Sequence, residues 1–293
     1  MKIFRDELRK REFVLTAECF LKPETDAEAI RHQANVLREH VDGIVLTDNQ
    51  HGQTHMSVIA AARLYLDNDV DPIVQLSCRN RNRIALVADM LGANALGVSS
   101  LLLSRGHRVP ESILPRPIAV HDLKTPELIA IAANLKSDDQ LKSAEDLLIG
   151  STVAPVAAKK GWVPEKVIDK IDAGAQFLLA NANLDIGLLR NYMSHLIATK
   201  LTRRASMIVS SVILSSADDA RWLRDRRANI TIPDAVVHRL ENAADPRAEG
   251  LAICAEHLSQ LAEIPGVSGA NIIASTDLTM IPEVINSANL GKV

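Results

Sequence analysis

The feature that most constrains the fold is a series of eight short apolar segments that alternate with longer segments of helical periodicity. The short segments are rich in Val, Ile and Leu, as strands buried on both faces are. The first three begin at residues 13, 43 and 73, and this spacing is typical of a βαβ unit. The predicted strands are residues 13–19, 43–47, 73–77, 95–102, 147–153, 176–180, 207–213 and 269–274.

The segments between and after these strands have helical patterns. In the first of them, Thr25 is the expected N-cap and Glu28 stands at the third helical position, which is a capping-box arrangement. The last is expected to close the barrel at the C-terminal end of the chain. The predicted helices are residues 26–40, 54–68, 81–91, 126–135, 164–173, 186–200, 217–227, 233–242, 246–263 and 278–289.

Eight strands that alternate with helices predict a (β/α)8 barrel over residues 1–293. A doubly wound α/β sheet is the second interpretation. It would need a Gly-rich phosphate loop after its first strand, and the sequence has none. No linker, low-complexity tract or internal repeat divides the chain, and α/β barrels of about 250 residues are commonly one domain. The sequence therefore predicts a single domain.

Composition argues against several classes of protein. The net charge is −3, and Lys and Arg form no block, which argues against a nucleic-acid partner. No apolar run approaches about 18 residues, so we expect no membrane span. The many charges in residues 1–12 argue against a signal peptide. The three cysteines are odd in number and far apart, which fits a reducing compartment and predicts a cytoplasmic protein.

Polar residues at the C-terminal ends of the predicted strands are the candidates for a functional site, because barrel enzymes place their chemistry there. Glu18, Thr47, Gln75, His107 and Asn181 end or follow strands one, two, three, four and six. Glu18 is either an acid–base group or a structural carboxylate paired with an arginine. His107 is either a site residue or a solvated loop residue. The residues alone predict a barrel enzyme with a polar mouth and specify no reaction.

Two further features of the predicted mouth bear on its chemistry. His51 and His55 stand four residues apart, a spacing that suggests a metal site, but no third ligand lies nearby in the sequence and no metal is predicted. Cys78 is expected to be a small packed residue rather than a nucleophile. The chain has only four Phe, two Tyr and two Trp residues, which is few for an enzyme that stacks a flat ring.

Several segments, taken in order from residue 17 to residue 267, resemble the methylenetetrahydrofolate reductase family. The order and spacing of these segments together carry the resemblance. The segments are 17–23 (resembling "FEFFPP"), 45–47 ("VTY"), 103–107 ("LRGD"), 172–177 ("DAGAdf") and 232–267, which is similar to the family's "IP…LE…D…" stretch before its last strand.

The resemblance implies an oxidoreductase of one-carbon metabolism that interconverts 5,10-methylenetetrahydrofolate and 5-methyltetrahydrofolate. It implies FAD as cofactor and NAD(P)H as the source of the hydride. Glu18 takes the general-acid position of the family, and a carboxyl group in a partly desolvated mouth suits that task. The cofactor-binding positions fall on Thr47, Gln75, His107 and Lys170, and the substrate-binding positions fall on Asn181, Ile213 and Ile273.

Departures from the family pattern leave the cofactor and the activity open. His107 stands where the family has an acid, Gln75 where it has His, and Asn181 where it has Gln. Ile213 and Ile273 replace aromatic residues. The reaction is therefore expected to be either FAD-dependent or a direct hydride transfer between NAD(P)H and the folate. A folate-dependent methyl-transfer barrel and a non-catalytic folate-binding subunit are the alternatives, and a homo-oligomer stays open.

Overall fold

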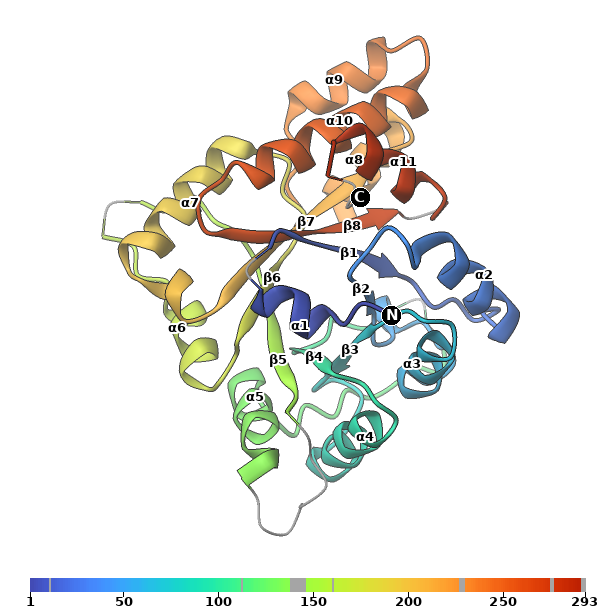
Figure 1. The fold of residues 1–293 in the computed structure, drawn as a ribbon, viewed down its shortest axis with the longest axis vertical. Helices are drawn as coiled ribbons and strands as arrows, with labels where there is room; N and C mark the ends of the chain where they lie inside the picture. Colours follow the sequence, from blue (N-terminus) through green and yellow to red (C-terminus); the bar gives the residue numbers. More distant parts are fainter. Residues whose placement is uncertain are drawn as a thin grey trace.

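A computed structural model of the chain describes residues 1–10, 12–111, 113–137, 146–159, 161–226, 230–274 and 277–290. Eight parallel strands form one closed barrel in chain order, with β8 pairing with β1, and helices surround it (Figure 1). The predicted single-domain (β/α)8 fold is confirmed. The strands are β1 (Val14–Cys19), β2 (Gly43–Leu46), β3 (Pro72–Ser77), β4 (Ser100–Ser104), β5 (Leu148–Val153), β6 (Phe177–Ala180), β7 (Ser206–Ile213) and β8 (Val267–Ala274).

The helices follow the strands, and two additional helices precede the one that packs on β7 and β8. Figure 1 shows α8, α9 and α10 together at one side of the barrel. The α-helices are α1 (Phe4–Arg9), α2 (Ala27–Leu37), α3 (Val58–Leu66), α4 (Arg83–Ala95), α5 (Thr125–Asn134), α6 (Glu165–Asp172), α7 (Ile186–Ala198), α8 (Ala217–Arg226), α9 (Asp234–Asn242), α10 (Pro246–Ala262) and α11 (Met280–Ser287).

The N-terminal end of the barrel is closed by α1, which lies across the strands in Figure 1. Phe4 and Leu8 of this helix are buried among inward-facing apolar side chains of the strands. The Phe4 ring meets Phe177 of β6 edge-on, with centroids 5.3 Å apart. Gly150 of β5 makes room for Phe177, because a Cβ atom there would lie 2.2 Å from that ring. The barrel interior is therefore filled at this end by described apolar side chains.

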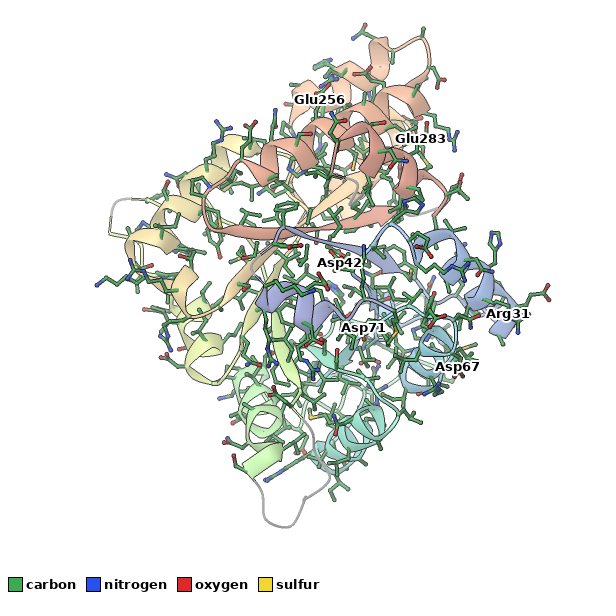
Figure 2. The ribbon with its side chains drawn as sticks, in the orientation of Figure 1. Arg31, Asp42, Asp67, Asp71, Glu256 and Glu283 are labelled. Carbon is green, nitrogen blue, oxygen red and sulfur yellow. The ribbon has the colours of Figure 1, made fainter. Side chains whose placement is uncertain are left out.

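Buried carboxylates fasten the closed end. The Asp71 carboxylate accepts a hydrogen bond from the Phe4 backbone N–H at 2.8 Å, and the Asp42 carboxylate accepts one from the Leu15 N–H at 2.9 Å. Figure 2 shows both carboxylates near α1. Each carboxylate accepts from a backbone N–H near the start of a helix or strand, where that N–H would otherwise have no partner. The closed end is thus held by polar contacts as well as by apolar packing.

Three details differ from the sequence-based prediction. The N-cap of α2 is Asp26 instead of Thr25, since the Asp26 carboxylate accepts from the Ala29 N–H and the Thr25 hydroxyl accepts from the Lys22 N–H. The predicted strand start at residue 95 is wrong, because α4 continues to Ala95 and the chain reaches β4 only after the left-handed turn at Gly97. The α1 helix was not predicted at all.

None of the described helices has both the length and the apolar character needed to cross a membrane. Cys19, Cys78 and Cys254 are free and buried. Burial raises the pKa of the Cys78 thiol to about 11, so the thiol is protonated near neutral pH. This state fits its expected role as a packed residue and not a nucleophile.

Candidate functional site

A cavity of about 310 Å³ opens at the C-terminal ends of the strands. Pockets of this size hold small ligands. Six of the eight residues predicted for the site line it, and they come from six different strand ends. These residues are Glu18, Thr47, Gln75, His107, Asn181 and Ile273.

Glu18 belongs to a buried network that crosses from β1 to β8 and β7. Its side chain faces the barrel interior, and the residue is 8% exposed. The Asn271 amide Nδ2 donates to Glu18 Oε2 and to the Ser210 hydroxyl, both at 3.3 Å. The Thr16 hydroxyl donates to Asn271 Oδ1 at 2.9 Å, which fixes the orientation of that amide. The carboxyl group is therefore held at the floor of the cavity by a side chain that is itself held.

A second polar network supports the wall formed by β2 and β3. The Asp48 carboxylate oxygen Oδ2 accepts hydrogen bonds from the Ser77 N–H at 2.8 Å, from the Ser77 hydroxyl at 2.7 Å and from Arg81 at 2.8 Å. Gln75 reaches the other way and donates to the Ser104 hydroxyl at 3.1 Å. These bonds join the ends of three neighbouring strands. The Thr47 side chain is therefore presented on a rigid edge of the mouth.

His107 is placed by the buried guanidinium of Arg79. Arg79 donates to the His107 carbonyl at 2.9 Å and to the Asn49 carbonyl at 2.6 Å, and it is 2% exposed. Between them Gly106 has a φ of +85°, and a Cβ atom at that position would lie 2.7 Å from the Arg79 Cβ. Only glycine lets the loop pass this close in a left-handed conformation. The loop thus carries the exposed His107 imidazole to the rim of the cavity.

The opposite wall combines aliphatic side chains with Asn181 and Ser210, and it is completed by a segment that precedes α9. Thr231 forms an isolated parallel bridge with Asn183, and the Leu184 N–H donates to the Thr231 carbonyl at 2.8 Å. This bridge brings Ile230 into the lining of the cavity, together with Ile273 of β8. A flat ligand in the cavity would therefore lie between polar groups on one side and aliphatic groups on the other.

Two predicted site residues do not reach the cavity. Ile213 lies at the outward-facing register of β7 and packs in the core between the barrel and its helices, because Ser210 faces inward and side chains alternate along a strand. Lys170, on α6, donates to the backbone carbonyl of Thr152. Burial lowers the pKa of Lys170, and the charge of Lys166 lowers it further. The structure brings neither side chain to the other predicted residues.

The His55 ring is bonded within its own loop. His55 Nε2 accepts from the Asn49 N–H at 2.9 Å, which leaves Nδ1 to donate to the Met56 carbonyl at 2.6 Å. Both ring nitrogens are thus used by the loop itself. In the described parts of the chain, no three His, Cys, Asp or Glu side chains gather as metal ligands.

Sequence reasoning missed the residues that hold Glu18. Thr16, Ser210 and Asn271 were each placed in a predicted strand, but none was named as part of the site. The sequence signal that could have indicated these residues is a polar side chain inside an apolar strand, two or more residues before the end of that strand. Asn271 in particular is completely buried, and an amide in such a place needs partners. Its partners come from β1 and β7, which the sequence separates widely.

The closed barrel, the filled N-terminal end and the polar cavity at the opposite end define a (β/α)8 barrel protein with a site at its strand ends. The family model described as methylenetetrahydrofolate reductase matches residues 3–288. The chain belongs to the methylenetetrahydrofolate reductase family. No curated protein gives a match.

Solved structures share the fold at low sequence identity. One is titled "Uncharacterized protein from Clostridium thermocellum binds two copies of 5-methyl-5,6,7,8-tetrahydrofolic acid". It is 14% identical, with a TM-score of 0.68 over 99% of each chain. DmoA from Hyphomicrobium sulfonivorans is 11% identical, with a TM-score of 0.56 over 94% of this chain and 86% of that one. At these identities the likeness concerns the fold alone.

The FAD contacts that the family resemblance implies are incomplete around this cavity. Thr47, Gln75 and His107 line it, but Lys170 does not, and its ammonium group donates to the Thr152 backbone carbonyl. None of the described residues that line the cavity is Phe, Tyr or Trp. The residues present therefore do not fit FAD in the way the resemblance implies.

Proposed function

We propose that this protein interconverts 5,10-methylenetetrahydrofolate and 5-methyltetrahydrofolate, with NAD(P)H or NAD(P)+ as the direct hydride partner. The observation that carries the proposal is the Glu18 carboxyl group, held by Asn271 at the floor of a cavity of suitable size in a chain of this family. Asp48 also lines this cavity, but its Oδ2 atom already accepts from Ser77 and Arg81. The tetrahydrofolate-binding barrel from Clostridium thermocellum supports a folate as the ligand.

In the reductive direction Glu18 donates its proton to the ring nitrogen N10 of the methylene bridge. The bond between N10 and the bridging carbon breaks, its electron pair stays on N10, and an iminium forms at N5. The nicotinamide C4 then delivers a hydride to that carbon, which gives the 5-methyl group and NAD(P)+. The Glu18 carboxylate recovers a proton from water. The reverse reaction uses the same groups in the opposite order.

The remaining side chains of the cavity bind and orient the folate. Asn181 offers an amide and Thr47 a hydroxyl to the polar edge of the pterin, while Ile230 and Ile273 cover an apolar face. Burial of the ring supplies most of its binding energy, so aliphatic walls suffice in place of aromatic ones. The same walls keep water from the iminium carbon, which water would otherwise attack.

Two measurements on the purified protein test the proposal. An absorbance spectrum reports whether flavin is bound, and an assay follows NADH and NADPH oxidation with 5,10-methylenetetrahydrofolate, with and without added FAD. We expect a colourless protein whose turnover needs no FAD. A yellow protein that loses activity when flavin is removed would refute the direct hydride route and leave the reductase activity in place.

The same assay distinguishes the other activities. Binding of 5-methyltetrahydrofolate without any nicotinamide turnover in either direction would refute the reductase proposal in favour of a folate-binding subunit. Transfer of the methyl group to a thiol or corrinoid acceptor would select a methyl-transfer barrel instead.

A further inference from the structure

A second, larger cavity adjoins the first on the side of β3 and β4. It encloses about 680 Å³ between the strand ends and the loop that follows β4. That loop folds back over β3, where the Val120 N–H donates to the Arg79 carbonyl at 2.8 Å and the His121 N–H donates to the Cys78 carbonyl at 3.0 Å. The two cavities share Gly106, His107 and Arg108 in their linings, so they adjoin at this segment of the loop.

The lining of this second cavity is strongly basic. Six of its eleven residues are arginine or histidine, and none of the described lining residues is acidic. The chain as a whole has a net charge of −3, so the concentration of cations is local. The basic residues are Arg79, Arg105, His107, Arg108, Arg116 and His121.

These positive charges act on one another. Burial lowers the pKa of His121, and the charges of Arg105 and Arg79 lower it further. Burial also lowers the pKa of the Arg79 guanidinium. Arg108 has one acidic partner, Glu111, at 2.9 Å, and both side chains of that pair are largely exposed. Like charges gathered in one concave place repel, and a bound anion relieves the repulsion.

The backbone holds this arrangement in place. Arg79 is fixed beneath the loop by carbonyl oxygens, and Gly106 allows the close approach that covers it. Arg105 and Arg116 are exposed on the two sides of the cavity and are not needed to hold the loop. A planar guanidinium binds carboxylate and phosphate groups with two parallel hydrogen bonds, which makes these arginines suitable ligands for such groups.

We propose that this cavity, lined by Arg105, Arg108 and Arg116, is a subsite for the polyanionic end of a ligand whose other end occupies the cavity above Glu18. The cavity would bind an extended molecule that carries several carboxylate or phosphate groups. Two reactants of the proposed reaction have such groups: a tetrahydrofolate with a chain of glutamyl carboxylates, and a nicotinamide dinucleotide with its phosphates. In this respect the inference rests on the proposed function.

Tripolyphosphate, which resembles neither substrate, tests the subsite by itself. Isothermal titration calorimetry at low salt is expected to show one site, weakened by about tenfold or more for each of Arg105→Gln and Arg116→Gln. Arg31→Gln is the matched control, since this exposed arginine lies on α2 (Figure 2) and lines neither cavity. The His121 ring, assigned by NMR with the His121→Gln variant, should titrate at higher pH when tripolyphosphate is bound. Equal affinity in all variants would overturn the proposal.

The source of the anion is distinguished with the Arg105→Gln/Arg116→Gln double variant. If the carboxylates of a folate occupy the subsite, wild type prefers triglutamyl over monoglutamyl 5-methyltetrahydrofolate and the double variant does not. If phosphates occupy it, the double variant loses affinity for NADPH and NADH while its folate affinities stay unchanged. No change in either arm would overturn the link to the cavity above Glu18.

Failure of the proposed function gives a different result from failure of the subsite. A protein that never oxidises NADH but still loses tripolyphosphate binding in the variants has the subsite without the reductase activity. A protein that oxidises NADH and binds tripolyphosphate equally in all variants has the activity without the subsite.

Discussion

At the scale of single residues, the site depends on how one carboxyl group is held. Glu18 contacts Asn271, and Asn271 is oriented by Thr16 and Ser210. In the proposed reaction Glu18 gives away a proton, and the Asn271 amide would keep the carboxyl group in one place during that transfer. Geometry of this kind is what makes a general acid effective.

The first prediction concerns Glu18→Gln. Glutamine has the same shape and still accepts from the Asn271 amide, but it has no acidic proton to donate. Turnover should fall by about 10²- to 10⁴-fold, as expected for loss of a general acid, while folate affinity stays within a few-fold. Steady-state NADH oxidation and folate titration measure the two quantities.

Glu283→Gln is the control for that experiment, because Glu283 is an exposed carboxylate of α11 (Figure 2). It should leave both quantities unchanged. If Glu18→Gln instead unfolds the protein and leaves activity per folded molecule intact, then Glu18 is a structural carboxylate. This is the alternative role that the sequence analysis gives for Glu18.

At the scale of elements, α1 separates the stability of the barrel from its chemistry. This short helix fills the end of the barrel opposite the cavity, so the strands can pack fully below the site and stay open above it. Gly150 and Phe177 form a matched pair within that packing, since the missing side chain at one makes room for the ring of the other.

The second prediction is that Phe4→Ala destabilises the protein without affecting the site. Phe4 is fully buried, and the loss of a buried phenylalanine costs about 3–5 kcal/mol. Urea unfolding should show this loss, and the dissociation constant for 5-methyltetrahydrofolate should not change. Ile84→Ala, at a position 79% exposed on α4, should change stability by less than about 0.5 kcal/mol. An unchanged unfolding midpoint for Phe4→Ala would mean that α1 does not close the barrel in solution.

The elements also show which parts of the structure the sequence could predict. All eight strands were predictable because burial on both faces makes each a compact apolar run. The bounds of the strands were less predictable than their existence. The start of β4 depends on where α4 ends, and Gly97 sets that point through a left-handed turn. The α1 helix escaped prediction because its six residues carry only two buried side chains among several charges.

The candidate site was partly predictable because its residues stand at the ends of predictable strands. Residues at strand ends could be assigned to the mouth from position alone, and six of the eight predicted ones line the cavity. The direction of a side chain could not be assigned. Ile213 faces outward because of the register of β7, and Lys170 is turned to a strand carbonyl. Family resemblance transfers a position in the sequence but not the contact made there.

At the scale of the whole molecule, two buried titratable groups give the stability opposite dependences on pH. Burial lowers the pKa of His257, on α10, to about 4, so the folded protein binds its proton less tightly than the unfolded chain does. Its contribution to stability is therefore lost as pH falls from about 6.5 towards 4. Burial raises the pKa of Asp71 to about 6. Its contribution is present at low pH and is lost as pH rises from about 3.8 through 6.

The third prediction follows from this opposition. For each variant, the difference is its free energy of unfolding minus that of wild type. For His257→Gln this difference should decrease by about 1–2 kcal/mol from pH 5 to pH 7, because wild type gains the contribution of His257 over that range. The difference between Asp71→Asn and wild type should increase by a similar amount, because wild type loses the contribution of Asp71. Urea titrations at several pH values measure both differences.

Taking differences from wild type removes the contributions of all other titrating groups that the substitutions leave alone. His32→Gln, at an exposed position on α2, is the matched control substitution. Asparagine at position 71 can still accept from the Phe4 N–H with its amide oxygen, so that substitution keeps the fastening of α1 and changes mainly the titration. Parallel curves for wild type and both buried variants would show that neither group is buried in solution as it is here, and they would count against the packing of α10 on β7 and of α1 on the barrel end alike.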